Sequence, residues 1–332
     1  MRIFLLLGIL TAGYFQRETW LKKQISGFAQ GTTYHITYYS GDTSITQANV
    51  DSVLNSIDSS LSIYKPYSTI TRFNQSEKGT VIDAHFIKVF NKSIETYKAT
   101  NGLFDITVAP LVTAWGFGAK KNNSMPDSAQ IEQLKECVSS DLLKLEGNFL
   151  RKEKPCVQVD VNGIAQGYTV DVLADYFESR GITNYIIEVG GEIRVSGRKM
   201  PSGEEMKIGI ESPGDDEIAP EIMQQVVKLK TGAITTSGNY RKYYESDGKR
   251  VSHLIDPRTG YSLQNEMISV TVYAKDAITA DAYDNALMTM GRDSALRFVE
   301  NRNDIAAYMI YKRKDGVVAD TATSKFYELM KQ

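Results

Sequence analysis

The chain has 332 residues, of which 42% are hydrophobic and 23% are charged. This length suits one large domain or two closely joined domains, and the composition excludes a wholly disordered chain and a polytopic membrane protein. The 38 basic and 40 acidic residues give a net charge of −2, so the sequence lacks the basic field of a nucleic-acid-binding protein. We therefore expect no nucleic-acid partner.

The N-terminus has the pattern of an export signal. A short basic start precedes the apolar run 3–10, and small residues follow at 11–13. The uncharged stretch ends before Arg17, well short of the roughly 20 residues that span a bilayer. It ends like a lipoprotein cleavage site, but Tyr14 stands where lipid attachment would need a cysteine. We expect residues 1–20 to be an export signal or a lipoprotein-like leader, with a buried N-terminal strand as the alternative.

Hydrophobic patterning in the first half of the chain predicts one strand and three helices. The segment 31–39 alternates and is rich in β-branched and aromatic residues, which is typical of a strand. Apolar residues at helical spacing predict helices over 50–61, 86–97 and 168–180, the last ending at a glycine. Residues 116–130 are rich in Gly, Lys, Asn, Ser and Pro and predict a loop.

The second half of the chain has several short strands in succession. The sequence predicts strands at 184–189, 192–197, 206–211, 224–230 and 267–274, then helices at 277–290 and 293–301 and a strand at 305–311. Such runs favour antiparallel sheets flanked by helices, an α+β fold rather than a doubly wound parallel sheet. The sequence contains no GxGxxG turn after a strand, no P-loop and no GxSxG, which argues against a Rossmann domain, a P-loop enzyme and an α/β-hydrolase.

A glycine-containing turn links a predicted strand to the predicted helix at 168–180. Asp160 follows an alternating apolar strand, and Gly163 and Gly167 lead toward the helix. Glycines let a backbone approach a ligand closely, and the N–H groups at a helix N-terminus attract anions. The same residues could also form only a capped turn.

Three oxygen-bearing side chains share one face of the predicted helix at 277–290. Asp281, Asp284 and Asn285 stand at i, i+3 and i+4. Two carboxylates and an amide carbonyl suit a hard cation such as Mg²⁺, which would also offset the repulsion between the carboxylates. The alternative is a solvated helix face.

Other candidate residues are more ambiguous from the sequence alone. His253 lies just before the turn sequence DPRTG and can titrate near neutral pH, although a lone histidine is often structural. Residues 237–241 could bring a hydroxyl and a guanidinium nearby. Tyr64 and Trp115 could stack on a flat ring or pack in the core. Two cysteines, at positions 137 and 156, are too few for a zinc site and could form one disulfide in an oxidising compartment.

Eight segments, taken together and in order, resemble the ApbE-like flavin transferases (FAD:protein FMN transferases). They are GTTYHIT (31–37), SIYKPYSTITRFN (62–74), FDITVAPLVTAWGFG (104–118), DVNGIAQGYTVD (160–171), VGGEIRVSG (189–197), TTSGNYRKYY (235–244), HLIDPRTG (253–260) and TADAYDNALMTMG (279–291). The resemblance implies one such domain over residues 25–330, with two intimately joined α/β subdomains and a flavin-nucleotide cleft between them.

The resemblance also implies roles for individual residues. The family's Mg²⁺ ligands fall on the Gly163 backbone carbonyl, Asp281, Asp284 and Asn285, and the histidine that assists catalysis falls on His253. The family's flavin contacts fall on Gln30, Tyr64, Thr113, Ala114, Trp115, Asp160, Gln166 and Ile255.

Three positions depart from the family's usual residues. Gln30 stands for methionine, Gln166 for lysine and Asn285 for threonine. Loss of the lysine removes a positive charge from a phosphate-rich site, and Asn285 keeps an oxygen donor with a different reach. These changes bear on the affinity for FAD and on the balance between transfer and hydrolysis.

The resemblance implies Mg²⁺-dependent transfer of FMN from FAD to a Thr or Ser hydroxyl of an acceptor protein, with release of AMP. The acceptor would be an exported or membrane-bound redox protein, so the chain would act in the periplasm, as a free protein or tethered to the inner membrane. Two alternatives remain open. The same site could hydrolyse FAD to FMN and AMP with water as the nucleophile, or the protein could bind FAD without catalysis.

Overall fold

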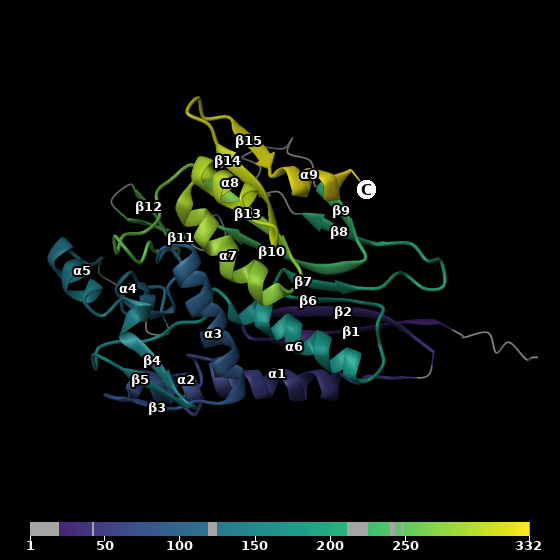
Figure 1. Ribbon diagram of the computed structural model, residues 1–332, viewed down its shortest axis with the longest axis horizontal. Coiled ribbons are helices and arrows are strands. Elements are labelled where there is room, and N and C mark those ends of the chain that lie inside the picture. Colours follow the sequence, from purple (N-terminus) through teal and green to yellow (C-terminus); the bar gives the residue numbers. More distant parts are fainter. Residues whose placement is uncertain are drawn as a thin grey trace, which may run out of the picture.

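The computed structural model describes residues 20–41, 43–118, 125–210, 225–239, 243–246 and 249–331. Its centre is an eight-stranded sheet in which each pair of neighbouring strands is antiparallel (Figure 1). In sheet order the strands are β1 (Leu21–Ala29), β2 (Thr32–Ser40), β6 (Tyr185–Val189), β7 (Glu192–Ser196), β10 (Thr231–Gly238), β13 (Met267–Ala274), β14 (Ile305–Lys312) and β15 (Val318–Ala322).

Three smaller antiparallel sheets stand beside the large one. They contain β3 (Gly79–Val81), β5 (Phe149–Lys152) and β4 (Leu143–Glu146), then β8 (Met206–Ile210) with β9 (Gln225–Leu229), and β11 (Tyr243–Ser246) with β12 (Lys249–Ser252). The α-helices are α1 (Gln47–Leu61), α2 (Thr69–Gln75), α3 (Ala84–Ala99), α4 (Ala109–Ala114), α5 (Ser128–Lys135), α6 (Ala165–Ser179), α7 (Ala277–Met290), α8 (Arg292–Glu300) and α9 (Ser324–Met330), with short 3₁₀ turns at Ile106–Val108 and Ser140–Leu142.

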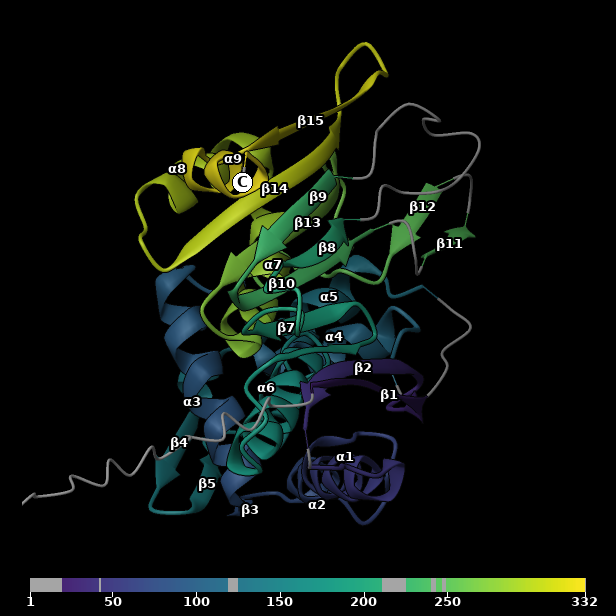
Figure 2. The same cartoon turned by 90° about the vertical axis from the view of Figure 1, so that its right-hand side faces the viewer.

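Helices cover one face of the large sheet. α6 lies against β6 and β7, α7 lies against β10 and β13, and α8 packs beside α7 against β14. Outside this layer, α1 packs on α6 and α3 packs on α7 (Figures 1 and 2). The β8–β9 hairpin and α9 cover part of the opposite face, where their apolar side chains meet those of β7, β10 and β14. The predicted α+β fold of antiparallel sheets flanked by helices is confirmed.

The twelve predicted helices and strands lie within three residues of their predicted bounds. The alternating strand expected before Asp160 is wrong, because the Val159 backbone pairs with the Asn74 side chain and not with another strand. The sequence did not predict the strands β1, β3, β4, β5, β10, β11, β12 and β15 or the helices α2, α4, α5 and α9.

α6 begins at Ala165, three residues before the predicted start, because Gly167 belongs to its first turn. The predicted loop over 116–130 is wrong at its end, since Asp127 caps α5 through a hydrogen bond from the Gln130 N–H. Residues 119–124 of that loop lie outside the described residues.

Among the missed strands, β10 carries Thr235 and Ser237. It follows β9 after a single residue, yet the two strands belong to different sheets. Gly232, the second residue of β10, takes φ +111°. Only Ala233 and Ile234 of the eight residues of β10 are apolar, so the strand lacks the apolar alternation that predicts a strand.

The structure also contains a disulfide, and its helices can be compared with the length needed to span a membrane. Cys137 and Cys156 form a disulfide with their Cα atoms 5.6 Å apart, which settles the pairing that the sequence left open. None of the helices in the described ranges is both long enough and apolar enough to cross a membrane. The predicted leader at 1–20 lies outside the described residues, apart from its last residue.

Gly167 sets the distance between α6 and α7. A Cβ atom at this position would meet the carbonyl oxygen of Ala277 inside van der Waals contact and would come 2.6 Å from the Cβ of Asp281. Both contacts are with the neighbouring helix, so only glycine allows the two helices to approach this closely.

We predict that Gly167→Ala destabilises the protein by about 1–3 kcal/mol, because the added methyl group must push α6 and α7 apart. The measurement is the urea concentration at half-unfolding. Gly209→Ala in β8 is the matched control, since a Cβ there would meet nothing within 4 Å. Equal stability of the two variants would contradict this account of the helix crossing.

Candidate functional site

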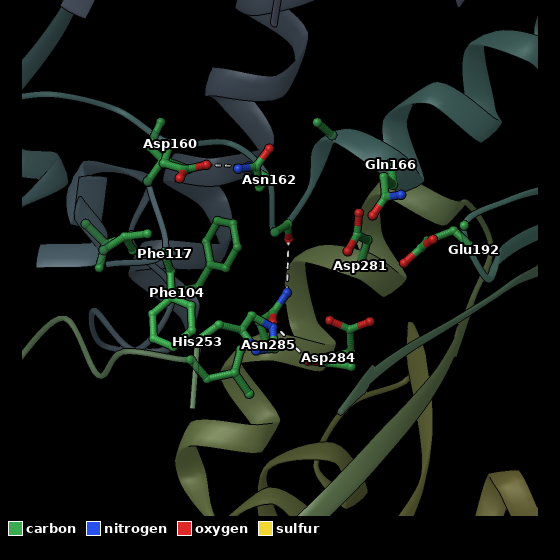
Figure 3. Close-up of a pocket in the computed structure, with 18 of the residues that line it drawn as sticks. Phe104, Phe117, Asp160, Asn162, Gln166, Glu192, His253, Asp281, Asp284 and Asn285 are labelled. Atoms are coloured by element: carbon green, nitrogen blue, oxygen red, sulfur yellow. Dashed lines mark hydrogen bonds between the residues drawn. The ribbon is translucent and has the colours of Figure 1, made fainter. Parts of the chain in front are cut away.

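A cavity of about 570 Å³ lies beside the α6–α7 crossing (Figure 3). This volume is in the range of small-molecule and cofactor sites. The cavity corresponds to the cleft that the sequence predicts. Ten of the thirteen predicted site residues line it: Gln30, Tyr64, Asp160, Gly163, Gln166, His253, Ile255, Asp281, Asp284 and Asn285.

Asp281 of α7 is held by the first turn of α6. Its Oδ2 atom accepts a hydrogen bond from the Gly167 backbone N–H at 2.8 Å, and its side chain is only 4% exposed. The first N–H groups of a helix have no partner within that helix, so this bond satisfies one of them and places a carboxylate at the positive end of α6.

Asp284 lies one turn further along α7 and is 1% exposed. Thr235 of β10 donates its hydroxyl to Asp284 Oδ2 at 2.8 Å. Within the described part of the chain, no donor reaches Asp284 Oδ1, although that atom is buried. Such an atom costs free energy unless a ligand binds it.

Asn285 joins the glycine turn to β10. Its Nδ2 group donates to the Gly163 carbonyl at 3.3 Å, and its Oδ1 atom accepts from the Ser237 hydroxyl at 2.9 Å. Rotation of the amide by half a turn would bring Oδ1 beside the Gly163 carbonyl and leave Nδ2 facing a hydroxyl, which accepts as well as donates. The Oδ1 atom of Asn285 and the Gly163 carbonyl oxygen could then face the same ligand.

The cavity wall is strongly acidic. Six of its described lining residues are carboxylic acids, and none of those lining residues is Lys or Arg; the six are Asp58, Asp105, Asp160, Glu192, Asp281 and Asp284. Figure 3 shows Asp281, Asp284 and Glu192 gathered beside Gln166. A cation that offsets the carboxylates would favour the binding of an anionic nucleotide in such a cavity.

Burial also disfavours the charged forms of the two aspartates on α7. It raises the pKa of Asp281 to about 7, and burial together with the charge of Asp281 raises the pKa of Asp284 well above its ordinary value. A bound cation would reverse this effect by favouring the ionised carboxylates.

The donor set fits a hard cation with oxygen ligands. It comprises two buried carboxylates, an amide and the Gly163 carbonyl, and Asp284 Oδ1 is a buried atom left for a ligand. Across the described ranges, nowhere do three or more His, Cys, Asp and Glu side chains gather as a metal site. The set therefore resembles a Mg²⁺ site completed by water and substrate oxygens rather than a closed protein cage.

The other side of Asn285 is apolar and aromatic. Figure 3 shows Phe104, Phe117 and His253 there, and the rings of Phe117 and His253 lie 6.2 Å apart between centroids. Ile255 adds a buried aliphatic side chain to the same cavity. Such surfaces suit a flat heteroaromatic ring.

Tyr64 and Gln30 lie at other parts of the cavity wall. Tyr64 is 63% exposed, which puts its ring at the opening of the cavity. Gln30 takes φ +54° in the β1–β2 turn, a conformation uncommon for a residue with a side chain, and its Oε1 atom accepts from Thr169 of α6 at 3.1 Å.

Gln166 and Asp160 are fixed by their local backbone. A Cβ on Gly190 would collide with the Gln166 amide, so that glycine makes room for the side chain. Asp160 Oδ1 accepts from the Asn162 N–H at 2.8 Å and thereby closes the turn that carries Gly163.

Thr113, Ala114 and Trp115 are the predicted site residues outside the cavity lining. The Trp115 side chain is buried at 6% exposure, and its indole N–H donates to the Gly260 carbonyl at 2.8 Å. Its neighbours Val112 and Phe117 line the cavity instead. The predicted guanidinium of residue 241 lies outside the described residues.

Sequence reasoning missed several residues of this site. Phe104, Phe117 and Glu192 line the cavity, and Thr235 supports Asp284 from β10. The alternation of Thr235 and Ser237 with other residues of one strand would have placed both hydroxyls on one face of a sheet, had β10 been predicted.

A model of the ApbE family matches residues 30–309. The FAD:protein FMN transferase of Vibrio cholerae is 37% identical over 91% of this chain and 91% of that protein, and the one of Escherichia coli is 36% identical over 80% of this chain and 76% of that protein.

Solved structures give the same match in three dimensions. The flavin transferase ApbE of Vibrio cholerae superposes with a TM-score of 0.84 at 35% identity, covering 94% of this chain and 100% of that chain. The apo form of the Pseudomonas stutzeri flavinyl transferase ApbE gives a TM-score of 0.85 at 32% identity, covering 94% and 98%.

The raised pKa values predict how stability depends on pH. The folded protein without a cation holds protons on Asp281 and Asp284 that the unfolded chain, with its pKa near 3.8, has already released. Between the pKa of the unfolded chain and the raised pKa of the folded protein, the folded state therefore binds more protons than the unfolded state. Its free energy of unfolding should fall as the pH rises toward about 7 and beyond.

Urea unfolding in EDTA at about pH 5.5 and about pH 8 measures this loss, and Asp284→Asn should make it smaller. Asp293→Asn is the control, because Asp293 is exposed and its pKa is lowered by its hydrogen bond with Arg292. An unchanged pH dependence in Asp284→Asn would show that Asp284 is ionised in the cation-free protein.

Proposed function

The chain belongs to the ApbE family, and from that premise we propose that it transfers FMN from FAD to a hydroxyl group of an acceptor protein. The observation that carries the proposal is the convergence of Asp281, Asp284, Asn285 and the Gly163 carbonyl on one wall of the cavity, next to an aromatic pocket. A dinucleotide needs both parts, one for its diphosphate and one for its flat ring.

The acidic wall would hold Mg²⁺ through Asp281, Asp284, Asn285 and the Gly163 carbonyl. When bound, the cation would neutralise the negative charge that builds on the pyrophosphate oxygens as a P–O bond breaks. The unpartnered Oδ1 of Asp284 and the acidity of the described lining support this assignment.

His253 would act as the general base. Its neutral imidazole takes the proton from a Thr or Ser hydroxyl of the acceptor as that oxygen attacks the FMN-side phosphorus. The bond from this phosphorus to the bridging oxygen breaks, and AMP leaves with the electron pair. Phe117 packs beside the His253 ring and limits its movement. The product is a phosphoester between FMN and the acceptor.

The remaining cavity residues would bind and orient the flavin nucleotide. Tyr64 at the opening and Ile255 in the interior offer contact surface to the ring, and Gln30 and Gln166 offer amide groups to hydroxyl and phosphate oxygens. Asp160 keeps the Gly163 turn in place. Gln166 is neutral, so it holds a phosphate less strongly than a lysine would.

Export to the periplasm completes the proposal. The disulfide between Cys137 and Cys156 supports an oxidising compartment, in which such bonds form and persist. The acceptor would then be an exported or membrane-bound redox protein. The leader at 1–20 would be cleaved, or would tether the chain to the inner membrane.

Incubation with FAD and Mg²⁺, with and without a co-expressed exported redox protein, separates the proposed activity from its alternatives. We expect mass spectrometry to find one added FMN on a Thr or Ser of the acceptor, together with AMP in solution. Release of FMN and AMP without labelling would indicate a pyrophosphatase. Intact FAD would indicate a binding protein and contradict the proposal.

Two substitutions test the assigned roles. Asp284→Ala removes a cation ligand and His253→Ala removes the base, so each should slow transfer about 100-fold or more. Asp293→Ala and His35→Ala are the matched controls, since both residues are exposed and lie outside the cavity lining. Wild-type rates in either cavity variant would remove that residue from the mechanism.

A further inference from the structure

The carboxylate of Asp171 ties the middle of α6 to the start of α7. Its Oδ1 accepts from the Ala277 N–H at 2.9 Å, and its Oδ2 accepts from the Ile278 N–H at 2.8 Å. Arg194 of β7 donates to Oδ1 at 2.6 Å. The side chains of this ion pair are 13% and 17% exposed, so the sheet, α6 and α7 are joined at a largely buried point.

A second connection runs parallel to this one. Gly167 lies one turn before Asp171 on α6, and Asp281 lies one turn after Ala277 on α7. The bond from the Gly167 N–H to Asp281 is therefore matched, one turn away, by the bond from the Ala277 N–H to Asp171. Two such connections fix the position of one helix along the other, whereas a single one would let α7 pivot.

α7 does not need Asp171 in order to begin. Asp276 already caps the helix, since its side chain accepts from the Thr279 N–H at 3.1 Å. A helix with its own N-cap gains little propensity from another acceptor. The contribution specific to Asp171 is the placement of α7 relative to α6, and so of the α7 oxygen donors relative to Gly163.

We propose that Asp171 and Arg194 are positioning residues for the cation site, because they hold α7 in the register that brings Asp281 and Asp284 opposite Gly163. Neither residue lines the cavity, so their effect acts through the helix. This inference rests on the proposed function, since it requires that the α7 carboxylates bind a divalent cation.

A purely electrostatic effect would have a different signature. Removal of the negative charge of Asp171 would weaken cation binding, but removal of the positive charge of Arg194 would strengthen it. Loss of position predicts weaker binding in both cases. The direction of the Arg194 effect therefore separates the two explanations.

The experiment titrates Mn²⁺ into the full chain without FAD and follows the free ion by electron paramagnetic resonance. We expect Asp171→Asn and Arg194→Gln each to raise the Mn²⁺ Kd about 10-fold or more, as loss of a group that orients metal ligands generally does. Asp276→Asn is the matched control: it removes one negative charge at the same helix end but keeps a capping side chain, and its Kd should stay within about twofold of wild type.

An unchanged Kd in both test variants, or tighter binding by Arg194→Gln, would overturn the inference even if the variants melt at lower temperature. Should Asp171→Asn fail to fold, Arg194→Gln decides alone, because it keeps the carboxylate that accepts from α7 and removes only the guanidinium that holds this carboxylate to β7. If the wild-type chain itself binds no Mn²⁺, the proposed cation site fails, and the inference fails with it.

Discussion

The close approach of α6 and α7 at Gly167 is the constraint on which the cavity depends. Gly167 belongs to the first turn of α6, where backbone N–H groups have no partner within the helix. The absence of a side chain brings one of these groups within reach of Asp281, a residue far away in sequence. A glycine inside a helix normally costs stability, and here it permits a contact that no other residue would allow.

The groups around the crossing leave the buried carboxylates incompletely satisfied. Gly167 gives Asp281 one hydrogen bond and Thr235 gives Asp284 one, while Asp284 Oδ1 has no donor among the described residues. A protein selected for stability alone would pair or remove these charges, since an unsatisfied buried network is costlier than an apolar one. A bound cation would provide the positive charge that these carboxylates lack in the protein itself, and the proposed function requires such a cation.

The sequence predicted the elements whose patterns are local. The helical spacing of α1, α3 and α7 and the alternation of β2 are each complete within one segment, and these elements lie close to their predicted bounds. The shared face of Asp281, Asp284 and Asn285 also follows from spacing. Spacing could not show whether water or protein covers that face, because burial depends on what packs against it.

Part of what the sequence did not predict depends on contacts between distant segments. The start of α6 was placed after Gly167, since only the partner helix explains a glycine there. β10 was missed, and with it the support that Thr235 gives Asp284. Trp115 could have stacked on a ligand or packed in the core, and the indole bond to Gly260 shows that it packs.

The departure from the family's usual residue at position 166 affects how the cavity would hold the phosphates of a nucleotide. Gln166 stands where the family commonly has lysine, and the described lining contains no Lys or Arg that could replace the charge of that lysine. The phosphates of a nucleotide would then be held by backbone N–H groups, by amides such as Gln166, and by the cation. Since the first two are neutral, the attraction between FAD and this acidic wall would come mostly from the divalent ion. On the proposed function, FAD binding by this chain should therefore depend on the cation more steeply than in a relative that keeps the lysine.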